Sequence, residues 1–189
     1  MADGTQGGTR RERIAVLGLG GGGGRVAAEL VGLGAVDHLD VAAADTDLSA
    51  LPNTPGLILI PLGQGWNCRH GCGGDAELGE RAAAASAGEL GQFIGGARLL
   101  LACVGLGGGA GSGAARVVAR LARDADVPVF FLVTVPFGFE GNWRRRQAEG
   151  ALAPLRELSD AVIVVKNDLL FTTLAADTPA AEAFRSADR

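Results

Sequence analysis

Two glycine-rich runs constrain the fold of this chain most, because each lies between an apolar segment and a segment of helical composition. The first is GLGGGGG at residues 18–24, and the second is GLGGGAGSG at residues 105–113. Glycine loses more backbone freedom on folding than any other residue, so such clusters need a local reason. The chain has 31 glycines among 189 residues, and these runs are the densest part of that set.

The apolar segments predict strands of a parallel sheet. Most are continuous apolar runs, which is typical of strands buried on both faces, whereas a sandwich strand alternates apolar and polar residues. The predicted strands are residues 14–17, 39–44, 57–61, 99–104, 127–135 and 161–165.

Segments rich in Ala, Leu, Arg and Glu separate these strands and predict helices. The alternation of strand, loop and helix indicates an α/β fold with three layers, a mostly parallel sheet with helices on both faces, in a Rossmann-like arrangement. We expect one domain over residues 13–189, preceded by a disordered tail over residues 1–12. The predicted helices are residues 25–33, 76–94, 114–123 and 143–158.

Composition excludes several classes of protein. The net charge of −4 gives no basic surface for a nucleic acid backbone, so DNA and RNA are not expected partners. No apolar run approaches the ~20 residues that a transmembrane helix needs, and the N-terminus has no signal peptide core. Three cysteines are too few for a disulfide framework, so we expect a cytoplasmic protein.

The first glycine run has more than one interpretation when taken alone. Backbone N–H groups and the following helix N-terminus could hold phosphates there. The run also contains Gly18-x-Gly20-x-x-Gly23, which fits a dinucleotide site with Asp40 or Asp45 as the ribose acid. A purely structural turn is the third interpretation.

The second run favours a polyphosphate ligand. Both runs follow a predicted strand, and the carboxyl ends of parallel strands are where open α/β sheets bind ligands. Two amide-lined loops in one small sheet therefore predict a ligand whose phosphates lie between them.

Several segments resemble the FtsZ/tubulin family. Residues 107–113, GGGAGSG, resemble its signature G-G-G-T-G-[ST]-G, and residues 133–148, VTVPFGFEGNWRRRQA, resemble V-T-x-P-F-x-F-E-G-x-x-R-x-x-x-A. Residues 163–170, IVVKNDLL, are similar to I-x-I-P-N-D-x-L-L. The first run, the Asp45-Thr46-Asp47 segment and GCGGDAELG at residues 71–79 extend the resemblance to nearly the whole chain.

The resemblance implies a guanine-nucleotide site, with GTP or GDP as ligand and Mg²⁺ as a candidate companion ion. Amides of both runs would hold the phosphates, and the loop at residues 71–74 would sense the γ-phosphate. Glu140 and Arg144 would hold the ribose. Phe184 would stack on the base, and Asp188 would read guanine, since a carboxylate accepts from both guanine N–H groups. The implied cofactor-binding residues are Gly20, Gly21, Gly22, Gly23, Gly24, Arg25, Gly71, Gly73, Gly74, Gly107, Gly108, Gly109, Ala110, Gly111, Ser112, Glu140, Arg144, Asn167, Phe184 and Asp188.

Some residues depart from the family pattern. Arg25 replaces an Asn, and contact with phosphates or exposure to solvent would both suit it. Ala110 replaces a Thr and removes one hydrogen bond worth about 1 kcal/mol. Cys68, His70 and Cys72 lie close together, but three candidate ligands in one loop are weak evidence for a metal site, and we expect none.

Two functions follow from the resemblance. The sequence ends at Arg189, before the acidic loop that, in the family, reaches the nucleotide of the next subunit, so we expect slow or no hydrolysis and no catalytic residue in this chain. The first hypothesis is a nucleotide-binding cell-division or cytoskeletal protein that can self-associate. The alternative is a non-catalytic regulator or scaffold that docks on, or caps, filaments of a full-length relative.

Overall fold

A six-stranded parallel sheet forms the centre of the protein. The computed structural model describes residues 13–34, 38–64, 71–172, 178–179, 182 and 186. The strand order is β3-β2-β1-β4-β5-β6, and every neighbouring pair is parallel, which confirms the predicted sheet. The strands are β1 (Ile14–Leu19), β2 (Leu39–Asp45), β3 (Ile58–Pro61), β4 (Leu99–Gly105), β5 (Val129–Val135) and β6 (Ala161–Lys166).

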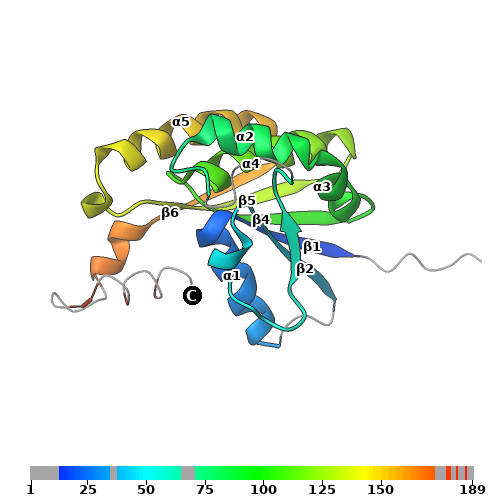
Figure 1. Ribbon diagram of the computed structural model, residues 1–189, viewed down its shortest axis with the longest axis horizontal. Helices are drawn as coiled ribbons and strands as arrows, with labels where there is room; N and C mark the ends of the chain where they lie inside the picture. Colours follow the sequence, from blue (N-terminus) through cyan, green and yellow to red (C-terminus); the bar gives the residue numbers. More distant parts are fainter. Residues whose placement is uncertain are drawn as a thin grey trace, which may run out of the picture.

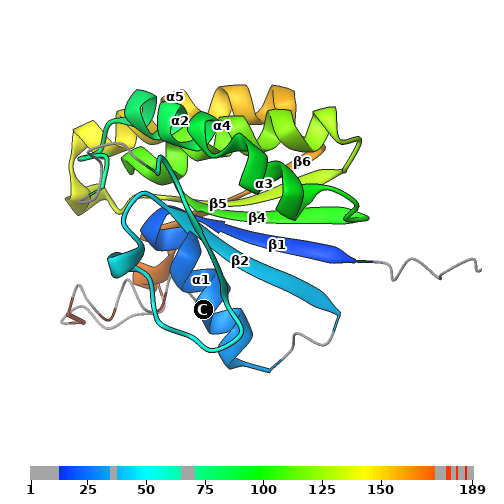
Figure 2. The same ribbon diagram turned by 45° about the vertical axis from the view of Figure 1, so that its right-hand side comes forward.

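Helices cover both faces of the sheet, as the sequence predicts. Of the described helices, four lie on one face, and α1 lies on the other beneath β1, β2 and β4 (Figures 1 and 2). The helices are α1 (Gly20–Gly32), α2 (Ala76–Ala85), α3 (Ala87–Ile94), α4 (Gly109–Asp124) and α5 (Asn142–Leu158), with 3-10 turns η1 (Leu48–Ala50), η2 (Gly138–Glu140) and η3 (Asn167–Thr172). None of the helices that the structure describes is long and apolar enough to span a bilayer.

The core is divided between the two faces of the sheet. The larger part lies beneath α2 to α5 and includes the fully buried Leu17, Leu100 and Phe131. The smaller part lies beneath α1 and includes Val16 and Val41. Adjacent residues of one strand, such as Val16 and Leu17, are therefore buried on opposite faces, which explains the continuous apolar runs.

The sequence predicted one helix over residues 76–94, and this was wrong: the segment forms two helices, α2 and α3, which are separated at Ser86. This side chain is buried, and its hydroxyl donates to the Pro61 carbonyl at 3.1 Å and accepts from the Gly63 amide at 3.0 Å. Both partners lie at the end of β3. The contact holds Ser86 against that strand end, and its backbone leaves helical geometry, with ψ at 19°.

Part of the sheet carries exposed apolar side chains. Phe130 and Leu132 alternate along β5 with the buried Phe131 and Val133, so they lie on the face opposite α5. Ile163 of β6 is 58% exposed, and Phe130 and Leu132 are 39% and 38% exposed. Because α1 contacts β1, β2 and β4, these three side chains form an apolar strip beside it.

Candidate functional site

A cavity of about 310 Å³ opens at the carboxyl ends of β1, β4, β5 and β6. From β1 the chain adds β2 and β3 on one side, and it then adds β4, β5 and β6 on the other side. The strand order therefore reverses between β1 and β4. Such switch points are where open α/β sheets bind ligands. The lining residues are Gly20, Gly21, Gly22, Arg25, Cys72, Gly105, Leu106, Gly108, Gly109, Ala110, Gly111, Thr134, Pro136, Glu140, Arg144 and Asn167.

Both glycine runs form first turns of helices, although the sequence predicted helix only after them. Helix α1 begins at Gly20 directly after β1, and α4 begins at Gly109. Within the described chain, neither start has a side chain that caps it by a hydrogen bond. The first N–H groups of a helix lack intrahelical partners, so two sets of amide donors and two positive helix ends meet at the cavity.

The helices begin inside the runs because close packing requires glycine there. A Cβ at Gly23 would lie 2.0 Å from the Cys103 carbonyl oxygen, and one at Gly113 would lie 2.3 Å from the Ala76 carbonyl oxygen. No side chain fits at those distances. Helix α1 therefore lies directly on β4, and α4 lies directly on α2.

Other glycines of the same runs have free space beside them. A Cβ at Gly108 would have no atom within 4 Å, and one at Gly21 would only approach Arg25 Nη1 at 3.7 Å and Asp45 Oδ2 at 4.0 Å. Both residues line the cavity. At these positions the absence of a side chain leaves room for a ligand near the backbone.

Ser112 supports the second run from inside the fold. Its hydroxyl is fully buried and accepts a hydrogen bond from the Gly107 amide at 3.0 Å. Gly107 has a φ of +91°, and a Cβ there would lie 2.8 Å from the Arg144 carbonyl oxygen. These two residues hold the turn between β4 and α4 and do not line the cavity.

Polar side chains from η2, α5 and η3 form the other end of the cavity. The Glu140 carboxylate accepts from the Phe137 amide at 2.8 Å and from Arg144 Nη1 at 2.6 Å. Asn167 follows β6 and is buried, and its Oδ1 has no hydrogen-bond partner among the described residues. A buried acceptor without a partner is costly, so Asn167 is suited to receive a donor from a ligand.

The loop at residues 71–74 lies beside the cavity, and Cys72 is its one residue among those that line it. Gly71, Gly73 and Gly74 have φ values of +85°, +55° and +87°, which favour glycine, and do not line the cavity. The Cys72 thiol lies 3.6 Å from Thr46 Oγ1. Gly23, Gly24, Gly71, Gly73, Gly74, Gly107 and Ser112 are the described members of the predicted set outside the lining.

Five lining residues were not predicted from sequence. Gly105 and Leu106 belong to the second run, Thr134 lies near the end of β5 and Pro136 directly follows it, and Cys72 lies between two glycines. All but Cys72 lie at or just after the carboxyl end of a strand, a position that could have identified them. Phe184, Asp188, Cys68 and His70 lie outside the described residues.

The position of Asp40 excludes it as the ribose acid of a dinucleotide site in this cavity. Asp40 lies at the amino end of β2, away from the cavity, and pairs with Arg13 at 3.0 Å. Asp45 lies at the carboxyl end, but its Oδ1 accepts from the Thr46 and Asp47 amides. Burial raises the pKa of the Asp45 carboxyl, and the two amide hydrogen bonds offset part of this rise.

The titratable groups that the structure describes form no cluster suited to a metal ion. Burial raises the pKa of the Cys103 thiol to about 11, so it is protonated at neutral pH. Among the residues that the structure describes, no group of three or more His, Cys, Asp or Glu side chains could hold a metal ion. The cavity's one carboxylate from the described chain is that of Glu140.

Comparison with known families settles the relationship. The model of the Tubulin/FtsZ family, GTPase domain, matches residues 13–175. The chain belongs to the Tubulin/FtsZ family. The Tubulin/FtsZ match covers β1 to β6 and every described residue that lines the cavity.

Relatives in this family are cell division proteins. The chain is 35% identical over 176 residues to the cell division protein FtsZ of Helicobacter pylori, covering 93% of this chain and 46% of the relative. It is 38% identical over 179 residues to the cell division protein FtsZ 2 of Rhizobium meliloti, covering 95% and 51%. The chain thus spans about half the length of the curated relatives it matches.

Solved structures share the fold. An empty FtsZ dimer from M. jannaschii superimposes with a TM-score of 0.86 at 31% identity, covering 94% of this chain and 51% of that one. A GDP-bound monomer of CetZ1 from Haloferax volcanii gives a TM-score of 0.79 at 25% identity, covering 93% and 56%. The α/β fold with a parallel sheet is thus that of FtsZ nucleotide-binding domains.

Proposed function

We propose that the chain binds a guanine nucleotide, GTP or GDP, in the cavity at the carboxyl edge of the sheet. One observation carries the proposal: the N-termini of α1 and α4 open on the same cavity as the buried Oδ1 of Asn167, which has no hydrogen-bond partner in the described part of the chain. The helix ends suit phosphates, and the amide oxygen suits an N–H donor of a base. Family membership supports the same ligand.

The lining divides into a phosphate end and a nucleoside end. Gly20 to Gly22 and Gly108 to Gly111 offer backbone amides for the phosphates. Arg25 also lines the cavity and adds a positive charge where the family pattern has Asn. Glu140 and Asn167 offer acceptors for the ribose and the base, and Phe184 and Asp188 remain predicted contributors.

Mg²⁺ would be held chiefly by phosphate oxygens of the bound nucleotide. The single carboxylate from the described lining, Glu140, already accepts on both oxygens. A hard divalent cation needs oxygen ligands, and the nucleotide itself supplies them. The protein's part is to fix the phosphates through the two helix starts.

The cavity is built for binding more than for hydrolysis. Activation of water needs a general base within hydrogen-bond reach of it. The Glu140 carboxylate is occupied by the Phe137 amide and by Arg144, and the lining has no second carboxylate in the described part of the chain. We therefore infer nucleotide binding with slow turnover by these 189 residues alone.

A second candidate function is docking on a full-length relative. Phe139 and Trp143 flank the lining residues Glu140 and Arg144 in sequence and are 56% and 61% exposed. Large exposed aromatic side chains next to a site are typical of protein interfaces. They favour a protein partner that covers the cavity, such as a second copy or a filament end.

Nucleotide titration tests the main proposal. A fluorescent GDP analogue should bind with a dissociation constant of about 1 µM or weaker, and unlabelled GDP should displace it, whereas NADH should not. Chromatography of the denatured protein should release guanine nucleotide that was bound during purification. Binding of NADH with no binding of GDP would replace this function by a dinucleotide site.

Sedimentation separates the two candidate functions. The chain is mixed with a full-length FtsZ under assembly conditions, with and without GTP. Shortening of the filaments at substoichiometric amounts supports capping, and assembly of the chain by itself supports self-association. Nucleotide binding with neither effect leaves only the first function.

A further inference from the structure

The two turns that follow β5 and β6 meet at the nucleoside end of the cavity. These strands are parallel neighbours, and their last paired residues are Val135 and Lys166. Beyond this pair, β5 continues into η2 with Glu140, and β6 continues into η3 with Asn167. The backbone pairing therefore ends just before the residues that line the cavity.

Glu140 is fixed within its own turn. Its carboxylate accepts from the Phe137 amide and from Arg144, and Phe137 stacks on Phe139 with ring centroids 4.9 Å apart. All of these contacts lie within residues 137–144. They hold the shape of η2 but leave its distance from Asn167 to be set by other contacts.

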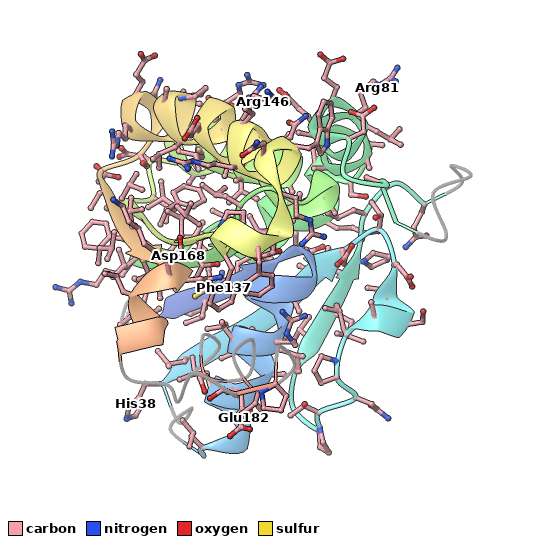
Figure 3. All side chains as sticks on the ribbon, turned by 90° about the vertical axis from the view of Figure 1, so that its left-hand side faces the viewer. His38, Arg81, Phe137, Arg146, Asp168 and Glu182 are labelled. Atoms are coloured by element: carbon pink, nitrogen blue, oxygen red, sulfur yellow. The ribbon has the colours of Figure 1, made fainter. Side chains whose placement is uncertain are left out.

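Asp168 supplies a contact between the two turns. Its Oδ1 accepts a hydrogen bond from the Gly138 amide at 2.9 Å, across 30 positions of sequence. A Cβ at Gly138 would lie 3.6 and 3.8 Å from the two carboxylate oxygens, so the carboxylate lies directly against the η2 backbone. Figure 3 shows Asp168 beside Phe137 where the two turns meet.

We propose that Asp168 is a positioning residue whose bond to the Gly138 amide holds Asn167 and Glu140 in register at the nucleoside end of the cavity. The inference rests on the proposed function, since it assigns the two held residues to a nucleotide. Asp168 is itself exposed and does not line the cavity. It acts through the backbone of η2, where the ladder between β5 and β6 has ended.

Three variants test this role by binding. Asp168→Ala removes the acceptor, Asp168→Asn keeps a carbonyl oxygen in its place, and Asp124→Ala removes an exposed acid at the far end of α4 as a charge-matched control. We expect Asp168→Ala to weaken GDP binding about tenfold, the loss of one hydrogen bond that orders the site. The GDP affinity of Asp168→Asn should stay within about threefold of wild type, and that of Asp124→Ala should equal wild type.

Inorganic pyrophosphate separates positioning from general damage. It competes with a fluorescent GDP analogue through the phosphate end alone, so its inhibition constant should be the same in Asp168→Ala and wild type. A parallel loss of GDP and pyrophosphate affinity would overturn the proposal, as would an Asp168→Asn variant no better than Asp168→Ala. Unchanged GDP affinity in Asp168→Ala would overturn it as well.

Amide hydrogen exchange tests the contact without nucleotide. The Gly138 N–H should exchange faster in Asp168→Ala and keep its protection in Asp168→Asn, with the melting temperature unchanged by more than a few degrees. Equal protection in all variants contradicts the inference even if GDP does not bind. Failure of the wild type to bind GDP, with the exchange result as expected, counts against the proposed function and leaves the contact established.

Discussion

Glycine has two different tasks within each run, and single residues show the division. Gly23 and Gly113 bring helices into contact with backbone atoms that a side chain would overlap. Gly108 has free space around it and lines the cavity. A sequence of consecutive glycines cannot reveal which task each performs, because the distinction depends on what packs against it.

Gly108→Leu should separate ligand binding from folding. The side chain would enter open space, so the melting temperature should stay within a few degrees of wild type, while GDP affinity should fall at least about a hundredfold by steric exclusion. Calorimetric titration and thermal unfolding measure the two effects. Gly88→Leu is the matched control, because Gly88 also has free space but lies on α3, outside the lining. Retained GDP affinity in Gly108→Leu would place the nucleotide elsewhere.

Asp45 should make stability depend on pH. Burial raises the pKa of its carboxyl in the folded state above 3.8, so the neutral form is favoured in the fold. The stability that this carboxyl contributes is fully present below its pKa in the unfolded chain. It is lost as the pH rises through its pKa in the folded protein. Asp45→Asn keeps an acceptor for the Thr46 and Asp47 amides and should therefore raise the free energy of unfolding at pH 7 more than at pH 4. Urea denaturation at both pH values measures this, and an equal change at both would contradict it.

The residues of the site were predictable to different degrees. Glu140, Arg144 and Asn167 come from motifs whose order in the chain is diagnostic, and the structure brings all three to the cavity. Cys72 carries no such signal. It lies at the cavity because the loop at residues 71–74 passes over α4, where a Cβ at Gly109 would lie 2.6 Å from the Cys72 Cβ.

Packing between helices, more than helix propensity, brings the N-terminus of α4 to the cavity. Helix α4 lies directly against α2, since a Cβ at Gly113 would come within 2.3 Å of both the Ala76 carbonyl oxygen and the Glu80 amide nitrogen. Arg120 of α4 also pairs with Glu80 of α2 at 2.8 Å. The N-terminus of α4 thereby reaches the cavity beside α1.

One substitution at two glycines should change stability in opposite directions. Gly113→Ala should lower the free energy of unfolding by about 3 kcal/mol, because backbone atoms of α2 would have to move. Gly91→Ala lies inside α3 with open space around it and should raise that free energy by about 0.5–1 kcal/mol through helix propensity. Chemical denaturation measures both. A Gly113→Ala variant as stable as wild type would show that α2 and α4 separate easily.

Strands were easier to predict than helix ends. Each strand is a run of mostly apolar residues, and in β1 these residues are buried on both faces, so composition alone distinguishes the strands. The starts of α1 and α4 were missed because glycine disfavours helix, and packing on β4 and α2 overrides that preference. The break at Ser86 depends on two partners at the end of β3, more than twenty residues away in sequence.

In the molecule as a whole, the described lining of the cavity offers amides, two arginines and Asn167, and its one carboxylate, that of Glu140, already accepts two hydrogen bonds. The 189-residue chain should therefore release phosphate from GTP at about 10⁻³ s⁻¹ or slower, the order of a GTPase that lacks groups for its transition state. A phosphate-release assay at several protein concentrations measures this rate. Gly108→Leu serves as the control, because activity that survives in it comes from a contaminant. Fast release that scales with protein and is lost in Gly108→Leu would show that a base has been overlooked.

The apolar strip formed by Phe130, Leu132 and Ile163 affects how such experiments are run. Environment-sensitive dyes such as anilinonaphthalene sulfonate adhere to side chains of this kind, so the native protein should fluoresce with them before any heating. A dye-based melting curve would start from a high baseline, so the rise in fluorescence on unfolding would be too small. Circular dichroism avoids that artefact, and loss of the early dye signal in Ile163→Thr would trace it to this part of the sheet.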